Sequence, residues 1–286
     1  MKAKKEHTAR KFKISTLAAH LILIIGSLIS IYPIYIMLID TLKSGTELTQ
    51  NIAGWPQNFT LENYINILSF NGSVIPKTFF NSVFVATCYT VITLFIASLA
   101  AFAFSKFRFK YKRFWFMFFL ITMMVPVEVN ISPLFLMFSK LGWLNTYIVQ
   151  ILPGIANVLA MYMYRNYMMS IPDSIVEAAR IDGASHIQIY RKVIMPMCTP
   201  VTGSLAIIMF MTKWNDYILP KLLIDKTETM PIMVLLPQLK EDASSYVVPW
   251  EVLLTGCAIV MVPMIIVFFA FQDKFMESVS VGAVKE

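Results

Sequence analysis

Six long runs of apolar residues dominate the chain, and polar or charged stretches separate them. About 20 apolar residues in a helix are enough to cross the hydrocarbon core of a bilayer. The pattern therefore predicts an all-α membrane protein with six transmembrane helices. The predicted spans are residues 14–39, 79–104, 114–138 with Glu128 inside the run, 146–164, 197–219 with Lys213 and Asp216 near its end, and 252–272.

Composition agrees with a lipid-facing surface. Hydrophobic residues make up 57% of the chain and charged residues only 14%, which leaves too few polar side chains to cover a water-facing protein of this size. The net charge of +7 comes from short basic clusters between the apolar runs, and this pattern sets membrane orientation. A nucleic-acid partner is therefore not favoured.

The basic clusters orient the chain, because short loops rich in Lys and Arg stay in the cytoplasm. Such clusters fill residues 1–13, the loop after the second span and the loop after the fourth. Both termini are therefore expected in the cytoplasm of a multi-pass protein of the bacterial cell membrane. The predicted parts are a basic N-terminus, 1–13; a permease domain, 14–272, with a cytoplasmic loop, 165–196; and a C-terminal tail, 273–286.

The loop 165–196 has the pattern of two short helices. Ser or Thr three residues before Glu or Gln is the spacing of a capping box, which starts a helix, and this spacing occurs twice. Between the two lies Gly183, which is expected to end the first helix because glycine readily adopts a left-handed conformation. The predicted capping boxes pair Ser174 with Glu177 and Ser185 with Gln188.

One face of the first helix is expected to be shallow, because two of its residues are alanines at helical spacing. A groove on a partner can approach such a face closely, and nearby carboxylates can accept hydrogen bonds from that partner. A plain surface helix with an internal Glu177–Arg180 pair is the alternative that periodicity alone leaves open. The predicted face comprises Ile175, Ala178, Ala179 and Asp182.

The same loop resembles the EAA loop of ABC importer permeases. The matching residues are Glu177-Ala178-Ala179, Gly183 and Val193-Ile194-Met195-Pro196, with valine and methionine in place of the usual isoleucine and leucine. Asp182-Gly183-Ala184 is similar to the carbohydrate-importing group of that family. Further similarity to the six-span subunit of maltose-type importers lies in Asn63-Tyr64, Pro126, Pro133-Leu134-Phe135, Leu141-Gly142, Asn145-Thr146 and the ending Gly282-Ala283-Val284-Lys285.

The resemblance implies a type I ABC importer permease (MetI-like) fold and a set of partners. These are a second homologous permease subunit, two cytoplasmic ATPase subunits and an extracytoplasmic solute-binding protein that delivers a sugar. The resemblance also implies that the loop helix lies in a cleft of the ATPase. The expected coupling residues are Glu177, Ala178, Ala179, Asp182, Gly183 and Ala184.

No cofactor is expected in this chain, because the resemblance gives ATP and Mg²⁺ to the partner ATPase. The sequence has no G-x-x-x-x-G-K-[ST] phosphate loop. An enzyme is not expected either, since the three histidines are widely separated and form no metal-ligand or catalytic spacing.

Two places are candidates for the substrate path. Trp214, Asn215, Asp216 and Tyr217 combine aromatic faces with amide and carboxylate groups, which suit a sugar's faces and hydroxyls. An interfacial aromatic belt with a Lys213–Asp216 pair explains the same residues. Glu128 is a carboxylate inside a predicted span, so it either lines a water-filled path or lies solvated near the outer boundary.

Rival functions remain open at this point. An ABC permease for another cargo, such as a glycerophosphodiester, a polyol or a peptide, shares the loop motif. A secondary transporter driven by protons or sodium usually carries several charged or unwound ion sites within its spans, whereas this chain offers chiefly Glu128.

Overall fold

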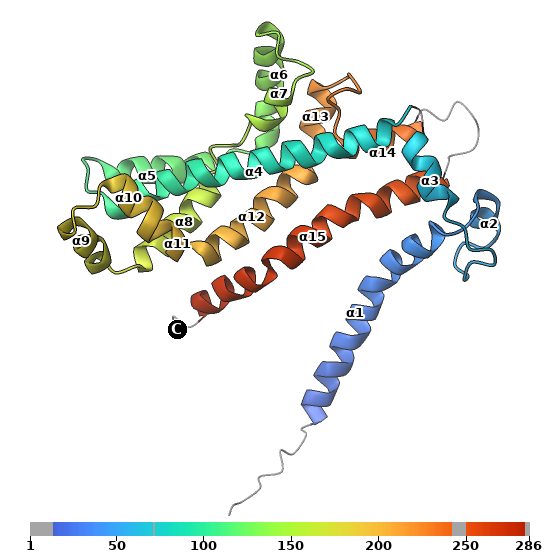
Figure 1. Cartoon of the computed structure of the whole chain (residues 1–286), viewed down its shortest axis with the longest axis horizontal. Helices are drawn as coiled ribbons and strands as arrows, with labels where there is room; N and C mark the ends of the chain where they lie inside the picture. The colour runs from blue at the N-terminus through green and yellow to red at the C-terminus, as the bar shows by residue number, and fades with distance from the viewer. Residues whose placement is uncertain (1–13, 71, 242–249, 284–286) are drawn as a thin grey trace, which may run out of the picture.

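In a computed structural model the chain is built from helices throughout its described residues, 14–70, 72–241 and 250–283 (Figure 1). Three helices are long and apolar enough to cross a membrane singly: α1 (Ile14–Asp40), α4 (Val74–Lys106) and α15 (Trp250–Ala283). The first, second and sixth predicted runs lie inside these helices. Helix α15 also continues through most of the predicted tail.

The third and fifth predicted spans are bent. Helix α5 (Lys112–Thr122) is followed by the 3₁₀ turn η1 (Val127–Asn130) and α6 (Ile131–Lys140), and the two parts meet at 86°. Pro126 lies at the end of the break, as the N-cap of η1, and its missing N–H prevents the helix from continuing through it. Before the fifth span, α10 (His186–Ile189), the π-helix η2 (Tyr190–Ile194) and α11 (Met195–Met197) meet α12 (Thr199–Trp214) at 79°.

The fourth predicted span is divided in two, α7 (Tyr147–Ile151) and α8 (Val158–Ser170). Pro153 and Gly154 lie between them, and Gly154 has a φ of 86°, which an α-helix does not allow. By length and composition the described part of the chain holds three spans, or up to five if each bent pair is one span. The predicted number of six is therefore not established.

Five shorter helices complete the chain: α2 (Gly45–Gln50), α3 (Glu62–Ser69), α9 (Asp173–Ile181), α13 (Ile218–Leu223) and α14 (Ile232–Glu241). The first two pack against α15 beyond the end of α1. Asn63 donates to the carbonyls of Thr41 (2.8 Å) and Lys43 (2.7 Å), and Lys43, fully buried, pairs with Asp40 at 2.7 Å. These bonds fix the turn that follows α1.

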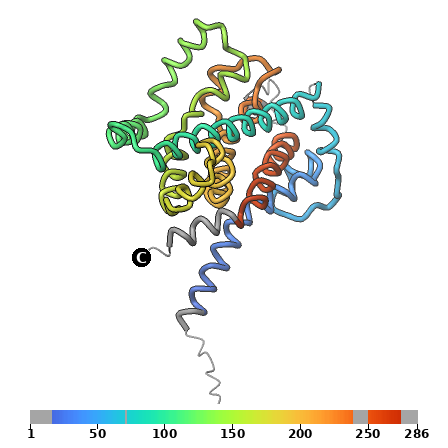
Figure 2. Tube along the Cα trace, turned by 60° about the vertical axis from the view of Figure 1, so that its left-hand side comes forward, coloured from blue at the N-terminus to red at the C-terminus, as the bar shows by residue number. Residues whose placement is uncertain are grey.

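The core lies around α4, which packs against α8 and α12, while α12 also packs against α15. Figures 1 and 2 show α1 leaving this bundle and running away from it. Its apolar side chains are uncovered, with Ile22 71% and Leu23 68% exposed. Apolar side chains of this kind need lipid or another chain to cover them.

Candidate functional site

The loop 165–196 forms a two-helix unit at one end of the bundle (Figure 1). Helix α9 ends as the sequence predicts, at Gly183, which has a φ of 78°. Ala184 N–H donates to Ala179 O at 3.0 Å and Gly183 N–H to Arg180 O at 3.0 Å, which satisfies the last carbonyls of the helix. Gly183 therefore sets the angle between the two helices of the unit.

Only one of the two predicted capping boxes forms. The Ser185–Gln188 box is confirmed, with Ser185 N–H donating to Gln188 Oε1 at 2.8 Å and Gln188 N–H donating to Ser185 Oγ at 3.4 Å. The Ser174–Glu177 box is wrong. Helix α9 begins two residues earlier than a Ser174 N-cap would require, with Pro172 as its N-cap, so Ser174 lies inside the first turn and caps nothing.

The predicted shallow face of α9 is divided between the protein and the solvent. Ile175 and Ala179 are half-buried and pack against the chain's own core. Glu177, Ala178 and Asp182 are exposed. The surface that α9 offers to another molecule is therefore these three residues together with Ile181, which is 87% exposed and was missed by sequence reasoning.

Of the ion pairs in the described part of the chain, none joins Glu177 to Arg180. The internal pair that belonged to the alternative of a plain surface helix is therefore not formed among these residues. Glu177 and Asp182 instead present carboxylates on either side of small apolar residues, an arrangement suited to a partner with basic or N–H donors.

A lysine fastens α9 to the long helix α4. Lys106, the last residue of α4, donates to Asp173 Oδ1 at 2.7 Å and to Ile171 O at 2.7 Å, and its side chain is only 3% exposed. The hydrogen bond from Lys106 and its positive charge hold the pKa of Asp173 below its usual range. Sequence reasoning used Lys106 only for orientation, because its partner lies 67 residues away.

A second attachment joins α8 to the same end of α4. Arg165 Nε donates to Phe104 O at 3.1 Å, and the Arg165 guanidinium lies 4.0 Å from the centre of the Phe116 ring. Such a cation–π contact adds about 1 kcal/mol. Helices α4, α5 and α8 and the start of α9 are thus connected where the loop begins.

The second candidate site follows α12. Trp214 is 1% exposed, stacks on Phe210 at 5.6 Å and meets Phe79 edge-to-face at 5.8 Å between ring centres. In this chain Trp214 is therefore a core residue and not an exposed platform for a sugar. Asn215 is exposed, whereas Asp216 and Tyr217 are half-buried.

The predicted Lys213–Asp216 pair is present. Lys213 Nζ donates to Asp216 Oδ2 at 2.7 Å; the lysine side chain is 5% exposed and the aspartate 24%. Lys213 also lies 5.4 Å from the centre of the Tyr89 ring on α4. Tyr217 accepts a hydrogen bond from Lys221 at 2.7 Å. The polar groups left accessible by this arrangement are those of Asn215, Asp216 and Tyr217.

Glu128 lies in η1, at the break between α5 and α6, where it is exposed. The carboxylate is therefore not buried in a helix packed within this chain. Both sequence interpretations, a water-filled path and a solvated boundary, are compatible with an exposed position on an uncovered turn.

Comparison with known proteins places this arrangement in a family. Residues 93–281 match the family model described as binding-protein-dependent transport system inner membrane component. The arabinooligosaccharides transport system permease protein AraQ of Bacillus subtilis is 30% identical, over 96% of this chain and 98% of the relative. The sn-glycerol-3-phosphate transport system permease protein UgpE of Rhizobium meliloti is 31% identical, over 93% and 96%.

The fold also matches a solved structure. A chain of a bacterial ABC transporter involved in the import of the acidic polysaccharide alginate superposes with a TM-score of 0.81 at 25% identity, covering 94% of this chain and 99% of the other. The chain belongs to the family of binding-protein-dependent transport system inner membrane components, the permease subunits of ABC importers.

Proposed function

We propose that the chain is one of two permease subunits of an ATP-driven importer of a sugar or oligosaccharide, and that α9 couples it to a cytoplasmic ATPase. The observation that supports coupling is the structure of α9. One side of this helix is exposed, and its first turn is bonded to α4. Glu177, Ala178 and Asp182 face outward, while Lys106 fixes the first turn to α4.

Coupling follows from this arrangement. A groove on the ATPase receives α9, and closure of two ATPase subunits on ATP and Mg²⁺ displaces it. The bonds from Lys106 to Asp173 and Ile171 pass the displacement to α4 as a rigid body. Alternating access then results from rocking of the bundle, and ATP chemistry belongs to the partner.

The remaining partners follow from the family and from α1. A second, homologous permease covers the apolar side chains that α1 leaves exposed. An extracytoplasmic solute-binding protein delivers the cargo on the side of α2 and α3. In this arrangement the chain spans the bilayer six times, with α7 and α8 together as the fourth span and both termini in the cytoplasm.

The cargo passes the polar groups that follow α12. Asn215, Asp216 and Tyr217 supply amide, carboxylate and phenol groups for hydroxyl recognition, and buried Trp214 supports them from behind. Glu128 contributes a second carboxylate to the path from the turn between α5 and α6.

A sugar is favoured because AraQ, similar over nearly the whole chain, is named for arabinooligosaccharides. The likeness to UgpE, named for sn-glycerol-3-phosphate, supports a second candidate, a phosphate ester of a polyol. A phosphate monoester or diester carries a negative charge, which the exposed Glu128 carboxylate would repel, whereas Lys213 offsets the charge of Asp216. The sugar is therefore preferred chiefly on the likeness to AraQ.

The test is reconstitution of the complex encoded with this chain in lipid vesicles. ATP hydrolysis and uptake are measured with and without the solute-binding protein, using arabinose- and glucose-based oligosaccharides and glycerol 3-phosphate. Stimulation and uptake with a sugar are expected. Stimulation by glycerol 3-phosphate alone would reject the sugar, and hydrolysis that responds to no binding protein would reject the importer.

A further inference from the structure

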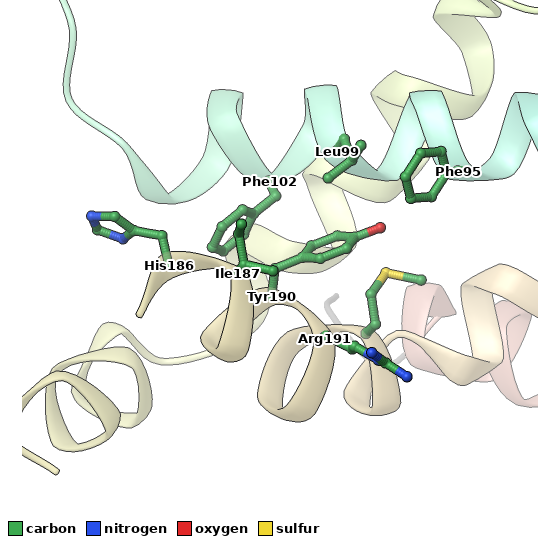
Figure 3. A pocket seen from close by; sticks show the side chains of 8 residues that line it. Phe95, Leu99, Phe102, His186, Ile187, Tyr190 and Arg191 are labelled. Carbon is green, nitrogen blue, oxygen red and sulfur yellow. The ribbon is translucent and has the colours of Figure 1, made fainter. Parts of the chain in front are cut away.

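A cavity of about 570 Å³ lies between the last turns of α4 and the α10–η2–α11 helix (Figure 3). Three α4 side chains at helical spacing, Phe95, Leu99 and Phe102, point towards Tyr190. Ile187 and Met195 complete an almost wholly apolar lining. The size lies within the range of roughly 300–1,000 Å³ that is typical of sites for small ligands.

The walls of this cavity are held in place. The hydroxyls of Tyr190 and Ser98 are hydrogen-bonded at 2.8 Å, and the rings of Tyr190 and Phe102 lie 5.5 Å apart. The Tyr190 hydroxyl is therefore already satisfied by the chain itself. A ligand inside meets chiefly hydrocarbon and aromatic surface, so its buried part has to be apolar.

In the orientation proposed above, with Lys106 at the cytoplasmic end of α4, the cavity lies within the cytoplasmic leaflet. Phe102 and Phe95 precede Lys106, the end of α4, by about 6 and 16 Å along the helix at 1.5 Å per residue. Phe95 is 57% and Leu99 40% exposed, so this side of α4 opens outward and is not sealed by the chain's own helices.

Basic groups occupy the polar edge of the cavity. Arg191 and His186 both contribute to its lining and are exposed, and Arg191 points away from α4 (Figure 3). Among the described residues Arg191 has no hydrogen bond or ion pair, and exposed Lys192 follows it. Arg191 is thus free to bind an anion, whereas His186 lies at the other end of the lining, with its ring 4.8 Å from that of Phe107 (Figure 3).

We infer that this cavity binds an anionic phospholipid of the cytoplasmic leaflet, with an acyl chain along Phe95, Leu99 and Phe102 and the phosphate at Arg191. Basic pockets at the cytoplasmic side of transmembrane helices favour such headgroups. The inference adds a lipid site to the proposed transporter and rests on its proposed orientation, with the loop 165–196 in the cytoplasm.

The site joins two parts that the proposed mechanism moves together. The acyl chain of the lipid would contact α4. Its phosphate would contact the helix that follows α9 after Gly183. A bound lipid therefore packs between the coupling unit and the membrane helix beside it. A second copy of this chain or the partner permease would cover the same apolar side chains without needing Arg191.

The experiment uses the complete transporter in vesicles that contain phosphatidylglycerol or phosphatidylcholine with a photoreactive group in the acyl chain. After illumination, labelled peptides are identified by mass spectrometry. Labelling of residues 95–102 and 186–195 by phosphatidylglycerol is expected, with competition by unlabelled phosphatidylglycerol only. Equal labelling by phosphatidylcholine would overturn the anionic headgroup, and cross-linking of these residues to the partner permease would overturn the lipid.

Two variants and one control sharpen the test. Arg191→Gln is expected to lower phosphatidylglycerol labelling about fivefold, the equivalent of one basic residue at an anionic surface. Leu99→Trp narrows the cavity between Phe95 and Phe102 and is expected to lower labelling of residues 95–102. Arg113→Gln removes the same charge from another exposed position at that end of the bundle and is expected to leave labelling unchanged. An equal loss in Arg113→Gln would show general charge attraction and overturn the site.

Discussion

Lys106 Nζ lies 2.7 Å from Asp173 Oδ1, and this contact ties the end of α4 to the first turn of α9. The lysine is 3% exposed at its side chain and the aspartate 78%, so the pair reaches from the core to the surface of the loop. A displacement imposed on α9 thus has a short route into α4.

Lys106→Met is expected to uncouple transport from hydrolysis. Hydrogen bonds to charged groups contribute about 1.5–3 kcal/mol, and screening at the exposed aspartate reduces the loss to about 1 kcal/mol. A fall of about fivefold in sugar transported per ATP hydrolysed follows. Lys110→Met, a neighbouring lysine over the Tyr111 ring, is the control. An unchanged ratio in Lys106→Met, with both activities measured in vesicles, would rule out this route.

The pH dependence of that tie has a definite sign. Because the pKa of Asp173 is lowered in the folded protein, the tie is complete above the ordinary range of an aspartate and is lost only as the pH falls through the lowered value. The transport ratio is therefore expected to show no titration from this pair near neutral pH. Asp173→Asn should lower the ratio at neutral pH as Lys106→Met does.

The loss of stability caused by substitutions of Gly183 should depend on backbone strain alone. A Cβ at this position meets nothing within 4 Å, so only the φ of 78° opposes a side chain. Gly183→Ala is expected to cost about 1 kcal/mol and Gly183→Asn less, because asparagine tolerates the left-handed region. Gly26→Ala, also without a close neighbour but inside helix α1, is the control and should not destabilise.

The readout for this series is hydrogen exchange of the peptides spanning residues 173–189 in the assembled transporter. The exchange rate is expected to increase from the wild type with Gly183, through Gly183→Asn, to Gly183→Ala. A Gly183→Ala variant that exchanges like wild type would mean that the left-handed turn is not needed there.

Lys213 and Asp216 should behave as a coupled pair in stability measurements. Asp216→Asn leaves a lysine that is 5% exposed without its charge partner, and the expected loss is about 2 kcal/mol, less than for a fully buried pair because the aspartate is 24% exposed. Lys213→Met combined with Asp216→Asn should recover most of that loss. Thermal unfolding of the purified complex provides the double-mutant cycle, and strictly additive losses would contradict the pairing.

Glu47 is expected to hold the turn after α2. Its carboxylate accepts hydrogen bonds from Gln57 N–H at 2.6 Å and Asn58 N–H at 3.4 Å, and the first of these is the main cause of its lowered pKa. The turn should therefore be ordered above the usual pKa of a glutamate and loosen as the pH falls through the lowered value. Glu47→Gln should speed hydrogen exchange of residues 51–58 at neutral pH, whereas Glu62→Gln, an exposed control, should not.

Sequence reasoning identified features set by short-range physics. Apolar runs marked the long helices, and Gly183 and the Ser185–Gln188 box were found because turn chemistry depends on few neighbours. The Ser174 box failed because Pro172 and Ser174 are both residues that can start a helix and lie two positions apart. Pro172 is the N-cap in the structure. Local pattern does not decide that competition.

Features set by packing between distant segments were missed. Trp214 is of a residue type that often binds sugars, but in the structure its ring packs between Phe79 and Phe210. The partner of Lys106 lies 67 residues along the chain, so no spacing rule reveals it. Sequence reasoning treated residues 146–164 as one span, whereas the structure separates α7 from α8 at Pro153 and Gly154.

Helix α1 is mostly uncovered by its own chain, since only 6% of the residues in its most apolar stretch are buried. Selection on most of its side chains therefore acts through whatever surrounds it and not through the core around α4. Across related transporters, substitutions along α1 should covary with residues of a neighbouring subunit more than with residues of the same chain. The sequence of α1 would then be constrained by its contacts with neighbouring subunits, while the rest of the chain is constrained by packing within its own core.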